Sequence, residues 1–381
     1  MDILAVNAGS SSLKYALYAH VDKGELDAPV FSGNVEGLEA PQDADDFDTA
    51  LQHLSAKLEH HLQGRPLAAV AHRVVHGGEW FREAVVVNPL VFERLQTLSG
   101  LAPLHQPHNL KGIKRFQALY PQVPQIACFD TAFHAHLPPE EYLFALPPTY
   151  NQQGIRRYGF HGLSYAYLQS QLQRLTPQAS HRVVMAHLGN GASLCAMKQG
   201  QSIATTMGFS AVEGLMMGTR SGSIDPGVLL HLLNQGMTTE ALTQLLYKQS
   251  GLLGVSGLAA DMRTLRANKN PQVQLAIDMF THRVVRETGA MTACLQGLDV
   301  LVFTGGIGEH DAQLRQDVCA QLGHLGVQLD AQKNTQALGQ QAMRIDQGTG
   351  QVEVWVIPTD EGRMAALSAR AVLNAADPQS L

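Results

Sequence analysis

The sequence has few cysteines, little charge and no long apolar run, and each shortage excludes a class of protein. The four cysteines, Cys128, Cys195, Cys294 and Cys319, are widely spaced and form no CxxC pair. This spacing disfavours a disulfide framework or a structural zinc site and favours a reducing cytoplasm. The apolar stretches are shorter than a membrane-spanning helix requires. The chain leads from Met1 directly into an apolar strand, so we expect no signal peptide.

Charge is sparse and slightly negative. Charged residues make up 16% of the chain and hydrophobic residues 45%, a balance typical of globular proteins rather than disordered ones. The net charge is −6 and no block is rich in lysine or arginine, so neither nucleic acid nor a membrane is an expected partner. A length of 381 residues exceeds one ordinary hydrophobic core and predicts two domains.

The first motif is a polar loop between two predicted strands near the N-terminus. Residues 3–6 are an apolar run, and residues 13–18 alternate apolar and polar side chains, as strands do. The loop 7–12 between them offers hydroxyls and backbone N–H groups, the donors that can hold a phosphate chain. Taken alone, it is equally well explained as a hairpin turn rich in Gly and Ser.

A second copy of this motif begins the second half of the chain. The strand expected at 182–188 leads into the turn Gly189–Ser193 and then into a strand at 194–197. Two such units suggest a duplicated fold with its ligand in the cleft between the halves. A proline-rich segment marks the predicted boundary between the halves, and the C-terminal helix is expected to return to the first domain. The predicted domains are 1–133 plus 364–381, and 134–363.

Hydrophobic periodicity, with Gly and Pro as terminators, predicts the other elements. Loops without a period are expected at 101–109, 207–225, 256–263 and 304–310, and the 207–225 loop is long enough to be functional. Helices are expected at 48–63, 110–119, 226–234, 239–249, 272–296, 311–322 and 363–375, and further strands at 67–75, 124–129, 202–206, 298–303 and 352–357.

Several side chains stand where such a fold places its chemistry, and most have a second interpretation. Arg73, near the end of a buried strand, needs an anionic partner, which a structural salt bridge would also supply. Asp130 follows a buried strand, where open α/β sheets bind ligands, or it caps a helix. Arg220 is a candidate anion clamp, whereas His161 on its own reads as a loop histidine. The glycine-rich turn 304–310 would let a nucleotide approach the backbone.

Together these stretches resemble the acetate kinases, within the superfamily of acetate and sugar kinases, heat-shock ATPases and actin. The resemblance implies an α/β protein of two duplicated actin-like ATPase (ribonuclease H-like) domains with the active site in the interdomain cleft. It implies a homodimer that uses Mg²⁺, or Mn²⁺, to transfer a phosphoryl group reversibly from ATP to acetate. The motifs that carry it run along nearly the whole chain: Asn7–Lys14, His72–Gly78, Leu101–His105, Phe129–His134, Gly159–Gly162, His187–Ser193, Glu213–Gly222 and Gly305–Glu309.

The resemblance also implies roles for individual residues. Arg73 and Arg220 would hold the carboxylate and the transferring phosphoryl, and His161 would donate a hydrogen bond to that phosphoryl. Asp130 would orient metal and substrate, with Asn7 and Glu361 at the metal. The nucleotide and phosphate residues would be Ser10, Ser12, Lys14, His105, His187, Gly189, Asn190, Gly191, Asp261, Met262, Arg263, Gly305, Gly306, Ile307, Gly308 and His310, and the acyl pocket would be walled by Val75, Leu104, Phe160 and Ala211.

The cations in this set suit phosphoryl transfer, in which the protein mainly positions reactants and neutralises charge. Acetate is already a nucleophile at neutral pH, so a general base is not required. A superfamily ATPase of the chaperone-like or actin-like kind, the alternative from another class, would need the phosphate loops. It would not need Arg73, His161 and Arg220.

The sequence departs from the family's usual pattern at some positions. Ala211 replaces a pocket-wall proline, and since one methylene changes binding by about 1–3 kcal/mol, we expect appreciable use of propionate. His310 replaces a usual asparagine, which leaves nucleotide selectivity open. The other departures are Gln106, Leu163, Tyr165 and Ser223.

Overall fold

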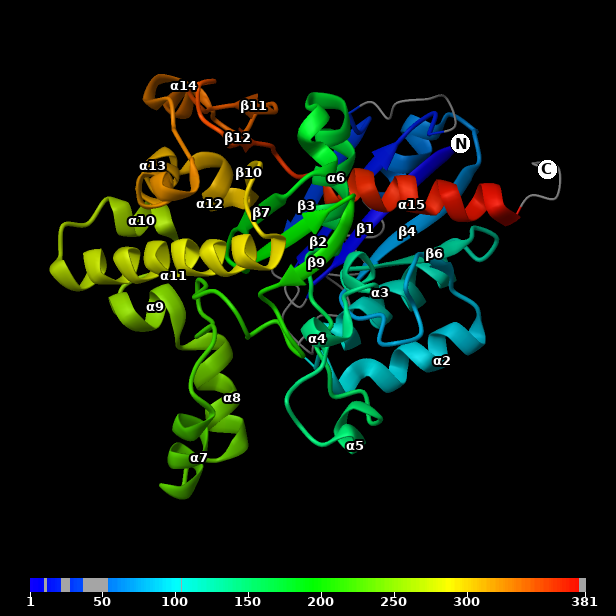
Figure 1. Ribbon diagram of the computed structural model, residues 1–381. Helices are drawn as coiled ribbons and strands as arrows, with labels where there is room; N and C mark the ends of the chain where they lie inside the picture. The colour runs from blue at the N-terminus through cyan, green and yellow to red at the C-terminus, as the bar shows by residue number, and fades with distance from the viewer. Residues whose placement is uncertain (10–11, 22–27, 37–53, 104, 377–381) are drawn as a thin grey trace. The chain divides into compact units, whose positions relative to one another are not determined.

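The computed structural model describes residues 1–9, 12–21, 28–36, 54–103 and 105–376. The chain divides into two compact units (Figure 1). Unit 1 contains Met1–Ala135, Gly162–Tyr167 and Asp360–Leu381, and unit 2 contains His136–His161 and Leu168–Thr359. These units are defined by packing, and the functional domains expected from the motifs stay a prediction.

Unit 1 is built on a mixed six-stranded sheet in the order β3-β2-β1-β4-β6-β5. β1 pairs antiparallel with β2 and parallel with β4, which confirms the predicted N-terminal hairpin. β4 is also parallel to β6, so their C-terminal ends meet at one edge of the sheet. The strands are β1 (Asp2–Ala8), β2 (Ser12–Tyr18), β3 (Phe31–Glu36), β4 (Leu67–Val74), β5 (Val85–Val86) and β6 (Gln125–Phe129).

Unit 2 repeats this sheet strand for strand. Written in the same direction as for unit 1, its order is β9-β8-β7-β10-β12-β11. β7 is antiparallel to β8 and parallel to β10, as β1 is to β2 and β4, and β12 lies between β10 and an antiparallel β11. The predicted duplication is thereby confirmed. The strands are β7 (Val183–Leu188), β8 (Ala192–Lys198), β9 (Gln201–Thr205), β10 (Val300–Thr304), β11 (Met343–Arg344) and β12 (Glu353–Val356).

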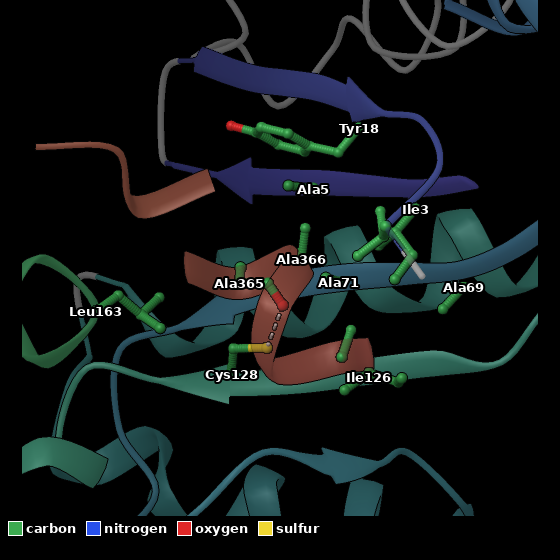
Figure 2. Close-up of a cluster of buried hydrophobic side chains, with 12 residues drawn as sticks. Ile3, Ala5, Tyr18, Ala69, Ala71, Ile126, Cys128, Leu163, Ala365 and Ala366 are labelled. Atoms are coloured by element: carbon green, nitrogen blue, oxygen red, sulfur yellow. Dashed lines mark hydrogen bonds between the residues drawn. The ribbon is translucent and has the colours of Figure 1, made fainter. Parts of the chain in front are cut away.

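The last helix, α15 (Glu361–Ala376), packs on β1 and β4 of unit 1 (Figure 1). The contact is made by small side chains, since Ala365, Ala366 and Ala369 lie in one buried cluster with alanines of β1 and β4 (Figure 2). The Cys128 thiol donates to the carbonyl of Ala365 at 3.6 Å, and its burial raises the pKa of the thiol to about 12. The other helices of this unit are residues 54–62, α2 (Pro89–Thr97) and α3 (Gln106–Leu119), with 3₁₀ turns at Leu98–Gly100 and Ala132–His134.

The longest helix, α11 (Pro271–Leu295), packs against β8 of unit 2 and buries the predicted face, which includes Ile277, Phe280 and Val284. The remaining helices are shorter. They are α4 (Pro139–Tyr142), α5 (Pro148–Asn151), α6 (Gly162–Leu175), α7 (Pro226–Asn234), α8 (Thr239–Lys248), α9 (Gly251–Ser256), α10 (Met262–Arg266), α12 (Gly305–His310), α13 (Ala312–Gln321) and α14 (Ala331–Gln336), with 3₁₀ turns at Pro177–Ser180 and Gly323–Leu325. The first turns of α6 belong to unit 1.

Short helices replace parts of three predicted loops. Residues 305–310 form α12. The helix contains several glycines, but the Glu309 carboxylate accepts the N–H of Gly305 at its start. α10 begins at Met262, after Asp261 accepts the N–H of Thr264. α3 begins at Gln106, four residues before the predicted start, because a proline suits the first turn. Part of the helix predicted at 48–63 lies outside the described residues. Among the described residues, no helix combines the length and apolarity needed to cross a membrane.

Candidate active site

The two strands that flank the first predicted phosphate loop line a pocket in unit 1. Asn7, at the end of β1, lies opposite Lys14 of β2 in the hairpin register, and Gly9 N–H donates to the carbonyl of Ser12 at 2.8 Å. Ser10 lies outside the described residues. A pocket of about 290 Å³ is lined by Asn7 and Lys14 together with Arg73 and Glu361. The predicted metal residues and two predicted anion-binding residues therefore share one cavity.

Arg73 lies between two carboxylates in this pocket. Its Nε and Nη2 donate to both oxygens of Asp130, the shortest contact being 2.7 Å, and its Nη1 lies 3.0 Å from Glu361 Oε2. Burial opposes the guanidinium charge, but the two carboxylates outweigh it and hold the pKa of Arg73 above its ordinary value. The Arg73 side chain is 21% exposed and that of Asp130 only 2%. The salt-bridge interpretation of Arg73 is thus confirmed, and part of the guanidinium can still meet a ligand.

Asp130 is placed by its strand rather than by a helix cap. It follows β6, and its N–H donates to the carbonyl of Val74 at 3.0 Å, which continues the parallel pairing with β4. The residue at the N-cap of the next turn is Thr131. The helix-cap interpretation of Asp130 is therefore wrong. Its carboxylate is instead committed to Arg73.

Two buried amides that were given no role from the sequence hold the segment after Arg73. Asn109 accepts the N–H of Val75 at 3.0 Å and donates to the carbonyl of Ala8 at 2.8 Å. Gln106, which replaces a usual asparagine, exchanges hydrogen bonds with the backbone of His76. Both amides lie on α3. The sequence predicted a loop at 101–109, so no helical spacing indicated that these two side chains lie on one helix. His105 is the N-cap residue of α3, and Leu104 lies outside the described residues.

Glu361 stands at the start of α15, next to an aspartate that fixes the helix end. Asp360 accepts the Tyr18 hydroxyl and the N–H of Arg363, both at 2.8 Å. Burial, and then the nearby Asp360 carboxylate, raise the pKa of Tyr18. The sequence pattern that could have shown Asp360 is an aspartate one residue before a helix.

The second phosphate loop gathers the other predicted cations in unit 2. His161 stacks on His187 with ring centroids 4.1 Å apart, and its Nδ1 lies 2.9 Å from Ser193 Oγ. A Cβ atom built on Gly191 would lie 3.3 Å from His161 Nε2 and 3.6 Å from Arg220 Nη1. The structure thus brings His161 and Arg220 to the same side of the loop. Arg220 is anchored there by a 3.0 Å hydrogen bond from Nη1 to the carbonyl of Ala211.

A larger pocket, of about 1030 Å³, adjoins this loop within unit 2. Asp261 and Arg263 form an ion pair at 3.1 Å on its wall, and hydrogen bonds from Arg263 and Thr264 lower the pKa of Asp261. His310 Nδ1 lies 3.0 Å from the carbonyl of Leu338, so that nitrogen carries a proton. The predicted nucleotide residues that line the pocket are Gly189, Asn190, Asp261, Met262, Arg263, Gly306, Ile307 and His310.

Glu309 supports the helix that carries Gly306 and Ile307. Its Oε1 accepts from the Gly305 N–H at 2.8 Å and from the Thr304 hydroxyl and the Thr359 N–H at 3.1 Å. One carboxylate therefore caps α12 and ties it to the segment after β12. Glu309 has no predicted role, because residues 304–310 were predicted to form a loop and a loop has no helix end to cap.

The predicted acyl-pocket residues belong to different units. Val75 lies in unit 1, whereas Phe160, which is 2% exposed, and Ala211 lie in unit 2. Their assembly into one pocket stays a prediction. Among the described residues, no group of three or more His, Cys, Asp or Glu side chains is arranged to hold a metal. Asn7 and Glu361 nevertheless suit Mg²⁺, which takes one or two oxygen ligands from the protein and others from phosphates and water.

The sheet topology and the two phosphate loops define the class of protein. The mixed sheet is duplicated, and each copy begins with a strand–loop–strand unit. Arginine and histidine side chains gather at the second of these units. This arrangement defines a nucleotide-dependent phosphotransferase of the actin-like ATPase fold. A family model described as the acetokinase family matches residues 2–367, and the chain belongs to this family. The chain is therefore a kinase with a carboxyl group as acceptor. This membership decides against the chaperone-like or actin-like alternative.

Named relatives agree along nearly the full length of the chain. An acetate kinase of Rhodopseudomonas palustris is 47% identical over 385 residues, covering 96% of each chain. The crystal structure of Porphyromonas gingivalis acetate kinase is 37% identical with a TM-score of 0.87, and covers 98% of this chain and 99% of its own. A propionate kinase structure from Francisella tularensis is 35% identical with a TM-score of 0.86, and covers 96% of this chain and 98% of its own.

Proposed function

We propose that the protein is an acetate kinase that transfers the γ-phosphoryl group of ATP directly and reversibly to acetate, giving acetyl phosphate and ADP. The observation that carries the proposal is the convergence of His161 Nε2 and Arg220 Nη1 over Gly191 of the second phosphate loop. A guanidinium and an imidazole N–H aimed at one spot beside a phosphate loop suit the charge that develops on a transferring phosphoryl.

Each reacting group has a distinct partner in this proposal. Arg73, held by Asp130 and Glu361, positions the acceptor carboxylate. Arg220 and His161 bind the oxygens of the transferring phosphoryl, where charge spreads as the bond to ADP breaks. The carboxylate attacks without losing a proton, so His161 and Asp130 serve as a donor and an orienting group rather than as bases.

Mg²⁺ is the proposed divalent ion, with Mn²⁺ as a substitute. Asn7 and Glu361 would hold it together with the nucleotide phosphates, and Asp130 would orient the acceptor carboxylate through Arg73. When bound, the ion neutralises charge on the phosphates. Lys14, Ser10 and Ser12 would belong to the phosphate side of the same hairpin, with His105, the N-cap residue of α3, in the same unit. The pocket of unit 2 would accept the rest of the nucleotide.

Ala211 favours propionate as a second acceptor. We expect the kcat/KM values for acetate and propionate to differ by no more than about 200-fold, the upper end of discrimination by one methylene. A hydroxamate assay with ATP, Mg²⁺ and a series of short carboxylic acids measures both the proposed reaction and this ratio. Ala211→Pro, which restores the usual residue, should raise the preference for acetate. A larger preference for acetate in the unaltered protein would reject propionate use. If no acid of the series were phosphorylated, the proposed function would be rejected.

We also propose a homodimer in which α7 contributes to the interface. α7 has no buried residue, and Val228, Leu230 and Leu233 are 41%, 62% and 39% exposed; in Figure 1 it lies well away from the strands of unit 2. An apolar helix left in water marks a contact surface. For the unaltered protein, light scattering should give the mass of two 41.2 kDa chains. For Leu230→Glu it should give the mass of one chain. Leu90→Glu, at a 56% exposed leucine of α2, should leave the mass unchanged; a monomeric unaltered protein would contradict the proposal.

A cytoplasmic location is proposed from the thiols. Cys128, Cys195, Cys294 and Cys319 are all free, and burial raises the pKa values of Cys195 and Cys319 to about 12. Free thiols of this kind suit a reducing compartment.

A further inference from the structure

We propose that Ser193 is a positioning residue for the phosphoryl transfer, because its hydroxyl donates to Nδ1 of His161 and so keeps the ring proton on Nε2. The inference rests on the proposed function, in which His161 donates a hydrogen bond to the transferring phosphoryl. Ser193 acts through His161.

Two neighbouring residues of the second sheet hold the His161 ring from different sides. His187 of β7 and Ser193 of β8 are partners in the antiparallel register, so their side chains project from the same face of the sheet. His187 stacks on the ring at 4.1 Å with an interplanar angle of 23°, and Ser193 Oγ lies 2.9 Å from Nδ1. Ser193 is fully buried and His161 is 9% exposed. The ring orientation is therefore set by both its face and its Nδ1 edge.

This orientation turns Nε2 toward the phosphate loop. A Cβ atom built on Gly191 would lie 3.3 Å from Nε2 and 3.6 Å from Arg220 Nη1, so both groups approach the loop at the same glycine. His161 is held there on a backbone with φ of +60°, a conformation that costs free energy in a residue with a side chain. The stack and the hydrogen bond therefore hold Nε2 beside the Arg220 guanidinium despite this cost.

The position of the ring proton decides what Nε2 can do. A neutral imidazole carries one proton, and if that proton were on Nδ1, Nε2 would present a lone pair to the anionic phosphoryl oxygens. A hydroxyl that donates to Nδ1 stabilises the other tautomer, in which Nε2–H is the donor. The proposed transfer requires this second tautomer, so the Ser193 proton is assigned to the bond with Nδ1.

The test compares Ser193→Ala with Ser193→Thr, which keeps the hydroxyl at a strand position. We expect Ser193→Ala to lower kcat for acetyl phosphate formation about 10- to 100-fold, the usual effect of losing a residue that orients a site group. The KM for ATP should stay within about two-fold, since the lost interaction acts in the transition state. Ser193→Thr should restore most of the rate. The control is Ser202→Ala, which removes another buried hydroxyl, 3.4 Å from Cys195 Sγ, and should leave kcat unchanged.

Long-range ¹H–¹⁵N NMR of the unaltered protein reads the tautomer without any variant. Nε2–H on His161 supports the inference, and loss of this preference in Ser193→Ala supports it further. Nδ1–H in the unaltered protein, or a kcat of Ser193→Ala within about two-fold of the original, overturns it. His161→Ala separates the two proposals. If that variant keeps its kcat, the role of His161 in the proposed function fails, and the positioning role of Ser193 fails with it. If His161→Ala loses its kcat while Ser193→Ala keeps it, only the role of Ser193 fails.

Discussion

Arg220→Ala is expected to abolish acetyl phosphate formation while nucleotide binding survives. Arg220 Nη1 would lie 3.6 Å from a Cβ atom built on Gly191, and Arg220 is not among the described residues that line the nucleotide pocket. Loss of an arginine that works mainly in the transition state of phosphoryl transfer should lower kcat by about 10³-fold or more. The hydroxamate assay measures kcat, and calorimetry with ADP measures binding.

Arg220→Lys provides the control for charge. A lysine keeps the positive charge but cannot both hold the Ala211 carbonyl and present a two-pronged donor to the phosphoryl. We expect it to recover only a small part of the lost rate. If Arg220→Ala weakened ADP binding as much as it lowered kcat, the assigned role would be wrong, because the residue would then serve nucleotide binding.

The fold was largely predictable because the motif that defines it is local and repeated. Each phosphate loop joins two adjacent strands, so residues 3–18 and 183–197 carry their own strand signals. These are buried apolar runs in β1, β7 and β8 and alternation in β2. The long helix α11 was predicted for the same reason, since its buried face recurs at helical spacing. The short helices were less predictable. α12 contains three glycines and is stabilised by the Glu309 carboxylate, which no propensity argument includes.

The candidate site was predictable where the residue itself carries the chemistry, and not where it supports another. Arg73 and Asp130 were found separately, but their 2.7 Å contact joins the ends of β4 and β6 and depends on sheet register. From the sequence, Ser193 is only one residue of a predicted turn, because its relation to His161 is visible only in three dimensions. Such supporting groups are polar residues in buried strands or helices, and the sequence alone does not distinguish them from packing residues.

Arg73→Ala should lose both activity and stability. The substitution removes the guanidinium from a carboxylate that is 2% exposed, and breaking a buried pair by removing one partner costs about 3–5 kcal/mol. The same guanidinium positions the acceptor carboxylate in the proposed reaction, so acetyl phosphate formation should fall by about 10³-fold. Urea denaturation measures the free energy of unfolding, and the hydroxamate assay measures the rate.

The double variant Arg73→Ala/Asp130→Asn separates the two losses. Asparagine at position 130 carries no charge, so the double variant should recover much of the stability lost by Arg73→Ala, since the buried carboxylate that faced the guanidinium is gone. It should recover none of the activity, because the acceptor still lacks its guanidinium. Recovery of both would show that Arg73 serves the fold alone. A single variant as stable as the original protein would show that the pair with Asp130 adds nothing to stability, and any loss of rate would then belong to substrate positioning.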